Sequence, residues 1–132
     1  MEREELTYTI IGCARRMHRV PGIGFQEVIC QRCLVLEWTD AGLEFVREKE
    51  QILWYKGSLV GTRRANFRME ERLIVELKAV INLEEVHLAQ AKNQVIACDF
   101  ARGMLINFGA INLQYKLIFN PRYNTPLLPN PH

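Results

Sequence analysis

Residues 63–79 read RRANFRMEERLIVELKA, two short alternating runs separated by the polar segment 69–72. Successive side chains of a β-strand point to opposite faces of its sheet. One face of such a strand pair would carry the apolar residues Ala65, Phe67, Leu73, Val75, Leu77 and Ala79. The other would carry Arg64, Asn66, Arg68, Ile74, Glu76 and Lys78. With a turn centred near residue 71, the pattern predicts a β-hairpin in which Asn66 lies opposite Glu76 on the accessible face.

The segments around this hairpin show helix and strand periodicity in turn. Apolar residues three and four positions apart predict helices over 5–19, 25–41 and 84–98. Shorter runs predict strands over 43–48, 51–56, 59–68, 73–79, 103–107 and 113–119. The resulting order predicts an α/β fold with a mixed central sheet flanked by helices. In a chain of 132 residues we expect one domain over 1–120 and an irregular, proline-rich tail over 121–132.

Glu76 and Lys78, two residues apart, share the polar face of the predicted hairpin with Asn66. Carboxylate and amide oxygens can hold a divalent cation, which polarises a phosphate and lowers the pKa of its bound water. A nearby lysine can stabilise negative charge on the phosphate or orient the nucleophile. The arrangement suits phosphodiester cleavage. An exposed strand with a charge pair is the commoner origin of this spacing, so the pattern alone leaves both interpretations open.

The net charge of +2 is too small to indicate nucleic-acid binding by itself. Two basic clusters are candidate nucleic-acid contacts or ordinary solvated surface; they contain Arg15 and Arg16, and Arg63, Arg64 and Arg68. No apolar run approaches the roughly 20 residues of a membrane helix. The N-terminus lacks the basic and apolar regions of a signal peptide. We therefore expect no membrane association and a cytoplasmic location.

The four cysteines include a C-x-x-C pair, Cys30 and Cys33, inside a predicted helix. Zinc binding or redox chemistry is one interpretation of this spacing. No second close pair is present to complete four zinc ligands. A redox pair would sit at the start of a helix that follows a strand, unlike this one. We favour free thiols in a reducing compartment.

Motifs spread over residues 4–119 resemble those of the GxxExxR family, which belongs to the PD-(D/E)XK nuclease superfamily. They are Leu6-Thr7-Tyr8, Gly22-Ile23-Gly24-Phe25-Gln26-Glu27, Tyr55-Lys56-Gly57, Gly61-Thr62-Arg63-Arg64, Val75-Glu76-Leu77-Lys78-Ala79, Val86-His87-Leu88-Ala89-Gln90 and Leu105-Ile106-Asn107-Phe108-Gly109. The resemblance implies a restriction-endonuclease-like core. It also implies nucleic acid as the partner and Mg²⁺ or Mn²⁺ as the cofactor.

The resemblance further assigns roles to individual residues. Glu27 matches the helix acid of the family's metal site, and Asn66 stands at the usual aspartate position. Glu76 and Lys78 match the E-x-K pair, and Gln90 matches the glutamine of the downstream helix motif. These five residues would form the catalytic set. The metal ligands among them would be Glu27, Asn66 and Glu76.

The chain departs from the family pattern at Asn66, at Gln94 (where a tyrosine is expected) and at Cys30 (where an aromatic residue is usual). An amide oxygen can still bind Mg²⁺ but brings no negative charge, so metal binding should weaken without being abolished. Two functions follow from the resemblance. One is a metal-dependent nuclease impaired by Asn66. The alternative is a catalytically inactive nucleic-acid-binding or protein-interaction module on the same fold.

Simpler interpretations exist for several polar and aromatic residues. Glu27 can be an acid that stabilises the first turn of its helix. A capping or core hydrogen bond suits His87 better than metal binding. Trp38 and Trp54 suit core or sheet-surface positions better than base stacking. A chain this small would need a homodimer to cut both strands of a duplex.

Overall fold

The computed structural model describes residues 2–22, 26–47, 50–64 and 67–123. Within these ranges the elements follow in the order α1 (Arg3–His18), α2 (Glu27–Asp40), β1 (Phe45–Arg47), β2 (Glu50–Tyr55), β3 (Ser58–Arg64), β4 (Phe67–Met69), β5 (Leu73–Lys78), α3 (Glu85–Ala97), β6 (Arg102–Asn107) and β7 (Gln114–Phe119). The three predicted helices and the order of elements are confirmed, with one strand more than expected.

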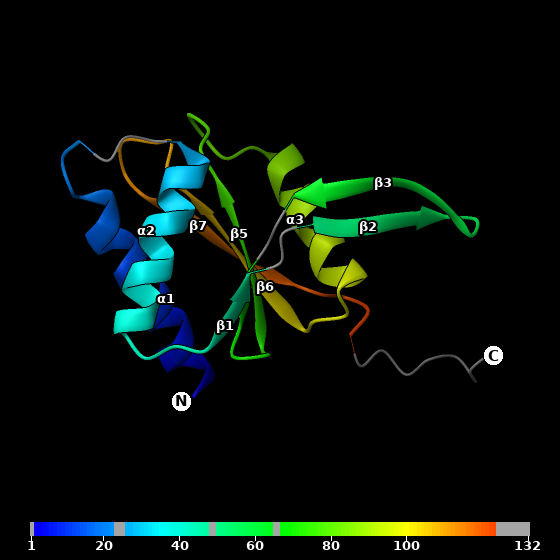
Figure 1. The fold of residues 1–132 in the computed structure, drawn as a ribbon, viewed down its shortest axis with the longest axis horizontal. Coiled ribbons are helices and arrows are strands. Elements are labelled where there is room, and N and C mark those ends of the chain that lie inside the picture. The colour runs from blue at the N-terminus through cyan, green and yellow to red at the C-terminus, as the bar shows by residue number, and fades with distance from the viewer. Residues whose placement is uncertain (1, 23–25, 48–49, 65–66, 124–132) are drawn as a thin grey trace.

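A five-stranded sheet in the order β1-β4-β5-β6-β7 forms the centre of the domain. β5 and β6 run parallel and are joined through α3, whereas the other neighbouring strands are antiparallel. Figure 1 shows α1 and α2 on one side of the sheet and α3 on the other. The predicted α/β fold with a mixed sheet flanked by helices is therefore confirmed.

Each face of the sheet has its own apolar core, and β5 contributes to both. Leu73, Val75 and Leu77 join the larger core against α1 and α2. Ile74 lies on the face predicted to be accessible, but this prediction is wrong at Ile74, which is buried in a smaller core against α3. This division follows from the two-residue alternation of side chains along a strand. β5 is thus anchored from both sides, which holds its remaining side chains in fixed positions.

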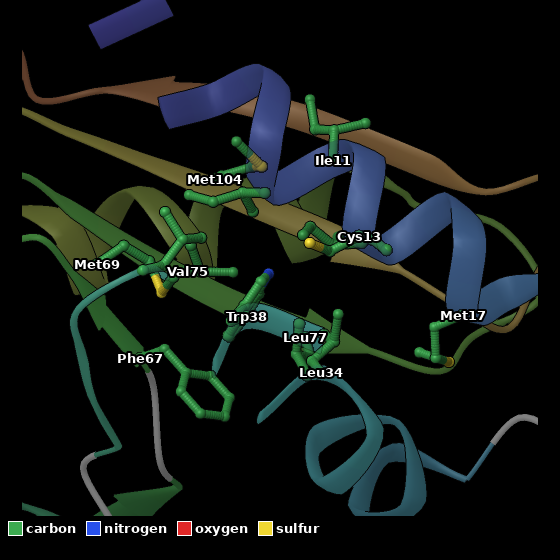
Figure 2. Packing of buried hydrophobic residues seen from close by; sticks show 14 of the residues in the cluster. Ile11, Cys13, Met17, Leu34, Trp38, Phe67, Met69, Val75, Leu77 and Met104 are labelled. Atoms are coloured by element: carbon green, nitrogen blue, oxygen red, sulfur yellow. The ribbon is translucent and has the colours of Figure 1, made fainter. Parts of the chain in front are cut away.

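Three aromatic rings anchor the larger core where α2 meets the strands before β5. Trp38 of α2 is fully buried and meets Phe67 edge to face, with ring centroids 5.0 Å apart and planes at 84°. Phe45 of β1 completes the group, 5.7 Å from Trp38 and 6.0 Å from Phe67. Figure 2 shows Trp38 between Phe67 and Val75, beneath the residues of α1. Trp38 is therefore a core residue, one of the two positions expected for it.

The predicted hairpin around residue 71 is confirmed in its described part. Phe67 pairs with Val75 and Met69 with Leu73, so the connection is centred on Glu71. The prediction of a single strand over 59–68 is wrong. β3 ends at Arg64 in a separate two-stranded sheet, and β4 begins at Phe67 in the main sheet. A strand pattern does not specify which sheet the strand joins, so periodicity could not reveal this change of sheet.

Some expectations concern parts of the chain outside the described residues. These are the loop at 23–25, the end of the predicted strand at residue 48, Ala65 and Asn66 of the hairpin, and the tail from residue 124 onward. Among the described helices, none has the length and apolar character needed to cross a bilayer.

Candidate active site

Glu76 and Lys78 lie on the same face of β5, as the alternation predicted. Both follow Ile74 at two-residue intervals, on the face that α3 covers nearer the start of the strand. Both side chains are half-buried, and the Oε2 atom of Glu76 is shielded from solvent. The backbone carbonyl of Lys78 accepts a hydrogen bond of 2.9 Å from the N–H of Phe108. A carboxylate and an ammonium group thus project side by side near the carboxyl end of a well-anchored strand.

A buried amide fixes the chain directly after this strand. Asn107 at the end of β6 is fully buried. Its Oδ1 accepts hydrogen bonds from the N–H groups of Val80 at 2.9 Å and Gly109 at 3.0 Å. Its Nδ2 donates to the Val80 carbonyl at 2.8 Å and to Gln114 Oε1 at 2.9 Å. The Asn107 side chain therefore joins the ends of β5, β6 and β7 next to Lys78.

Gly109 allows the close approach on which this junction depends. A Cβ atom at this position would lie 2.3 Å from the Val80 carbonyl oxygen and 2.4 Å from the Val80 nitrogen. Both neighbours are backbone atoms, so a side chain here would displace the segment that follows Lys78. Sequence reasoning singled out Asn107 and Gly109 only as parts of a family motif. Their positioning role could not be found from periodicity, which does not identify hydrogen-bond partners.

Glu27 is the first residue of α2 and lies in phase with the buried face of that helix. Cys30, Leu34 and Trp38 follow it at three- and four-residue intervals and are all buried. Figure 1 shows that α2 begins at the end of the domain where β5 finishes, and the two elements contact each other. Glu27 therefore lies near the end of the sheet where β5 finishes, in phase with the buried face of α2.

The resemblance assigns Glu27 and Glu76 to one metal site, but the structure has α2 and Glu76 on different faces of the sheet. α2 covers the face formed by Leu73, Val75 and Leu77, whereas Glu76 belongs to the opposite face. β4 begins at Phe67, which pairs with Val75, so the described part of β4 does not extend alongside Glu76. An ion shared by the two carboxylates would have to lie on this side of β5, next to Glu76. Asn66 itself lies outside the described residues, as do the side chains of Arg63 and Arg64. The three-ligand site remains a prediction.

Two of the predicted nucleic-acid contacts pack against aromatic rings. Arg68 pairs with Ile74 across the hairpin and so lies on the same face as Glu76. Its guanidinium carbon is 5.6 Å from the centroid of the Phe100 ring. Arg15 of α1 lies 5.8 Å from the ring centroid of Tyr115, on the other side of the sheet. Cation–π packing orients both groups without removing their charge.

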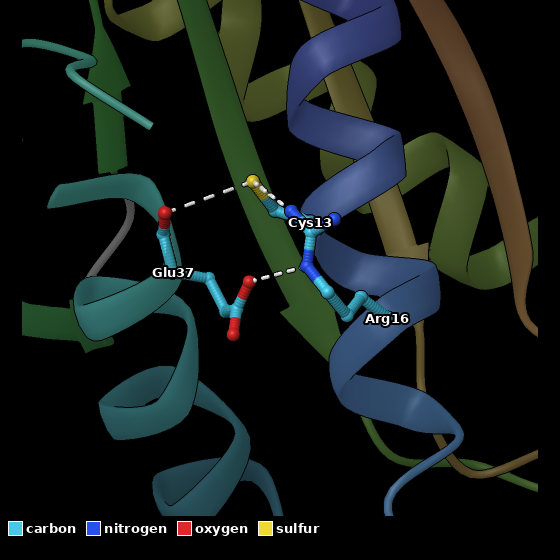
Figure 3. A network of polar contacts seen from close by, with 3 residues as sticks. All are labelled: Cys13, Arg16 and Glu37. Atoms are coloured by element: carbon cyan, nitrogen blue, oxygen red, sulfur yellow. Dashed lines mark hydrogen bonds and ion pairs between the residues drawn. The ribbon is translucent and has the colours of Figure 1, made fainter. Parts of the chain in front are cut away.

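Arg16 forms an ion pair with an acid of the neighbouring helix. Its Nε donates to Glu37 Oε1 at 2.8 Å, and its Nη2 contacts Cys13 Sγ at 3.8 Å (Figure 3). The thiol of Cys13 in turn lies 3.8 Å from the Glu37 carbonyl oxygen. These contacts link α1 to α2. Because an exposed pair of this kind contributes little stability, its main effect is to offset the charge of Arg16.

The polar residues of α3 divide into exposed and structural positions. Gln90 is exposed on this helix. Its catalytic role stays a prediction. Gln94 is fully buried, and its Nε2 lies 3.5 Å from Cys98 Sγ. The Nδ1 atom of His87 accepts a hydrogen bond of 2.9 Å from the N–H of Glu84 at the start of the helix. The expected capping role of His87 is confirmed.

The cysteines are free thiols, of which Cys13 and Cys30 are buried and Cys33 and Cys98 half-buried. Cys13, Cys30, Cys33 and Cys98 are all unbridged. Burial, with Cys33 and Glu27 nearby, raises the pKa of Cys30 to about 11. A raised pKa keeps this group a thiol at neutral pH, whereas reactive cysteines need a lowered one. No cluster of three or more histidine, cysteine, aspartate or glutamate side chains suited to a metal ion occurs in the described part of the chain.

The mixed sheet, the crossover helix and the E-x-K strand together define a restriction-endonuclease-like α/β protein. The chain belongs to the PD-(D/E)XK nuclease superfamily, whose sequence model matches residues 4–118. Nucleases of this superfamily generally use divalent metal ions.

The fold is also similar to that in the crystal structure of SSO0001. The TM-score is 0.51 at 12% sequence identity, and the alignment covers 90% of this chain and 62% of that one. At this identity the likeness shows the fold alone, and the chain spans less than two thirds of that protein. A comparison with curated protein sequences finds no match.

Proposed function

We propose that the chain is a divalent-metal-dependent nuclease of the GxxExxR type, with its centre at the carboxyl end of β5. The observation that carries this proposal is that Glu76 and Lys78 lie on the same face of one anchored strand in a PD-(D/E)XK fold. The end of α2 that begins with Glu27 lies at the same end of the sheet. The function is hydrolysis of phosphodiester bonds in DNA or RNA.

The proposed ligands suit Mg²⁺ or Mn²⁺. Glu27 and Glu76 would supply carboxylate oxygens and Asn66 an amide oxygen, the hard ligands that such ions prefer. The bound ion would polarise the phosphate and lower the pKa of a water molecule. Two carboxylates in place of three give a weaker site, which predicts a requirement for high metal concentration.

The protein groups around the ion would position the substrate. Lys78, near the carboxyl end of β5, would donate to a phosphate oxygen and balance charge that develops during cleavage. Arg68, on the same face, would hold a neighbouring phosphate, with Arg63 and Arg64 adjacent in sequence. Gln90 completes the set. Arg15 and Arg16 lie on the far side of the sheet, so we propose for them only a peripheral contact with a long substrate.

The substitution at position 66 favours a second candidate function. An asparagine in place of the family's aspartate removes one negative charge from the ligand set. A chain that has lost catalysis but kept the fold would act as a nucleic-acid-binding or protein-interaction module. The two functions differ in one observable, namely cleavage that depends on both the metal and Glu76.

A cleavage panel tests the proposal. Single-stranded and double-stranded DNA and RNA are incubated with the protein in Mg²⁺, in Mn²⁺ and in EDTA. We expect metal-dependent cleavage of at least one substrate, and a loss of about 100-fold or more in Glu76→Gln. Glu71→Gln is the matched control, because Glu71 is an exposed acid at the opposite end of β5. Cleavage unaffected by Glu76→Gln, or none with any substrate, would favour the binding module.

A further inference from the structure

The β2–β3 hairpin stands apart from the rest of the domain. Its two strands pair only with each other, and their extensive contacts among the described residues are mutual. Figure 1 shows the hairpin leaving the centre of the domain and extending away from the five-stranded sheet. Lys56 and Gly57, with φ of 51° and 77°, form its tip, the pattern of a type I′ turn. The hairpin is therefore a projecting arm that presents both of its faces.

One face of this arm carries large apolar side chains. Trp54 pairs directly with Leu59, and Ile52, two residues before Trp54 in β2, lies on the same face. Trp54 is 63% exposed, Leu59 57% and Ile52 49%. Val60 is the extra residue of a β-bulge beside them and is also exposed, because Trp54 pairs with Leu59 and Leu53 with Gly61. These four residues form what we call the arm patch.

Exposure of this patch is unfavourable for an isolated arm. A two-stranded hairpin is at best marginally stable in water without a surface to pack against. Contiguous exposed apolar side chains on a soluble protein generally mark an interaction site. A tryptophan at the centre of such a patch is the residue type that contributes most to binding at protein interfaces. The arm therefore has the character of one half of an interface.

The composition of the arm favours a protein partner over nucleic acid. Residues 51–62 contain a single charged residue, Lys56, at the tip, and the other charged residues of the arm, Glu50, Arg63 and Arg64, lie at its base. Nucleic-acid binding draws most of its affinity from lysines and arginines that neutralise phosphates. Depletion of charge with enrichment of aromatic residues is instead the signature of protein interface cores. Phosphate contacts thus fit Arg63 and Arg64 at the base of the arm, and not the patch.

A second copy of the same chain suits the patch best. A two-fold interface places the same patch of both copies in contact, so like charges within it would repel. The near absence of charge between residues 51 and 62 removes this obstacle. The patch offers on the order of 400 Å² per copy, about half of the roughly 800 Å² per partner in a standard interface. A dimer held mainly by this contact should dissociate at low concentration.

We propose that the arm patch binds the arm patch of a second copy of this chain, forming a two-fold dimer. This inference does not depend on nuclease activity. If the proposed function also holds, the dimer has a functional consequence. Each arm ends at Arg64, two residues before Asn66, so self-association would tether two candidate sites through their arms.

Sedimentation equilibrium or light scattering of the wild type from about 1 to 100 µM tests the dimer. We expect a monomer at the low end and a dimer at the high end. Trp54→Lys and Leu59→Lys should stay monomeric throughout, with unchanged circular dichroism. Ile111→Lys is the matched control, because Ile111 is 93% exposed outside the arm, and it should dimerise like the wild type. A wild type that is monomeric at 100 µM, or a Trp54→Lys protein that still dimerises, overturns the proposal.

Tryptophan fluorescence provides a second measurement that needs no variant. Trp38 is fully buried, so a change of emission with concentration reports on Trp54. We expect the emission maximum to shift to shorter wavelength over the concentration range in which the mass doubles. If Trp54 instead responds to added duplex DNA while the protein stays monomeric, the arm contacts nucleic acid and the proposal is wrong. Nuclease assays on the same samples separate this result from failure of the proposed function.

Discussion

The two hairpins of this domain differ in what holds them in place. Both turn through consecutive residues with positive φ: Lys56 and Gly57 in the arm, Glu70 and Glu71 between β4 and β5. The β4–β5 hairpin lies inside the main sheet with an apolar core on each face. Glu70 also holds its turn to the backbone of Glu44, donating from its N–H at 2.8 Å. The arm lacks comparable packing among the described residues.

This contrast separates two kinds of stability. Residues of the β4–β5 hairpin contribute to the global free energy of unfolding, because removing them opens a cavity or leaves a buried polar group unpaired. Residues of the arm contribute to local order and to association. The candidate site belongs to the first region, which keeps Glu76 and Lys78 in place. The arm belongs to the second, where side chains remain available to a partner.

The largest expected difference in stability between the two hairpins comes from truncating one aromatic residue in each. Phe67→Ala should lower the free energy of unfolding by about 3–5 kcal/mol, because Phe67 is buried edge-on against Trp38 and Phe45. Trp54→Ala should change it by less than about 0.5 kcal/mol in the monomer. Urea denaturation at low protein concentration measures both. Similar losses for the two variants would mean that the arm packs on the core.

A smaller loss is expected at the junction beyond β5. Asn107→Ala removes four hydrogen bonds and leaves both Val80 backbone groups short of partners. We expect a loss of about 2–3 kcal/mol. Asn112→Ala is the matched control, because this asparagine is exposed in the nearby loop and should be neutral. If Asn107→Ala keeps wild-type stability, water replaces the amide and the junction does not position Lys78.

Much of the fold could be predicted from the sequence, because periodicity reports which side of an element is buried. The alternation of 73–79 correctly assigned Leu73, Val75 and Leu77 to a core face and left Glu76 and Lys78 together, but it did not predict the second core that buries Ile74. Periodicity did not predict that 59–68 divides between two sheets, since a strand pattern carries no information about its partner. Trp54 is exposed on β2, one of the two positions expected for it, but the strand pattern could not decide between them.

The candidate site was less predictable than the fold. The spacing of Glu76 and Lys78 follows from local alternation, so it could be predicted. The approach of Glu27 depends on how α2 crosses the sheet, which no local pattern specifies. The Asn107 junction combines three strand ends that are distant in sequence. Such contacts arise from tertiary structure alone, so only a family motif hinted at them.

The smallest expected effects compare the two turns. Glu71 has a φ of 54°, a conformation that glycine adopts without strain. Glu71→Gly should therefore raise the free energy of unfolding by about 0.5–1 kcal/mol. Lys56→Asn creates the Asn-Gly pair that type I′ turns prefer. The Lys56→Asn substitution should slow hydrogen exchange in the arm. It should raise the melting temperature by less than Glu71→Gly does, because the arm opens before the core. Equal shifts in melting temperature would show that the two hairpins unfold together.

Asn66→Asp tests most directly whether the carboxyl end of β5 is a metal centre. The new carboxylate adds one negative charge to the proposed ligands, which should tighten Mg²⁺ binding. Without metal, the crowded carboxylates should lower the melting temperature relative to the wild type, and Mg²⁺ should restore it by mass action. Cleavage should rise at least ten-fold, about 1.4 kcal/mol of barrier.

The decisive measurement is the melting temperature of Asn66→Asp with and without Mg²⁺, beside the double variant Asn66→Asp with Glu76→Gln. We predict a metal-dependent rise in the single variant that is larger than in the wild type and is lost in the double variant. No metal-dependent stabilisation in the single variant, or an equal one in the double variant, would contradict a metal centre built on Glu76.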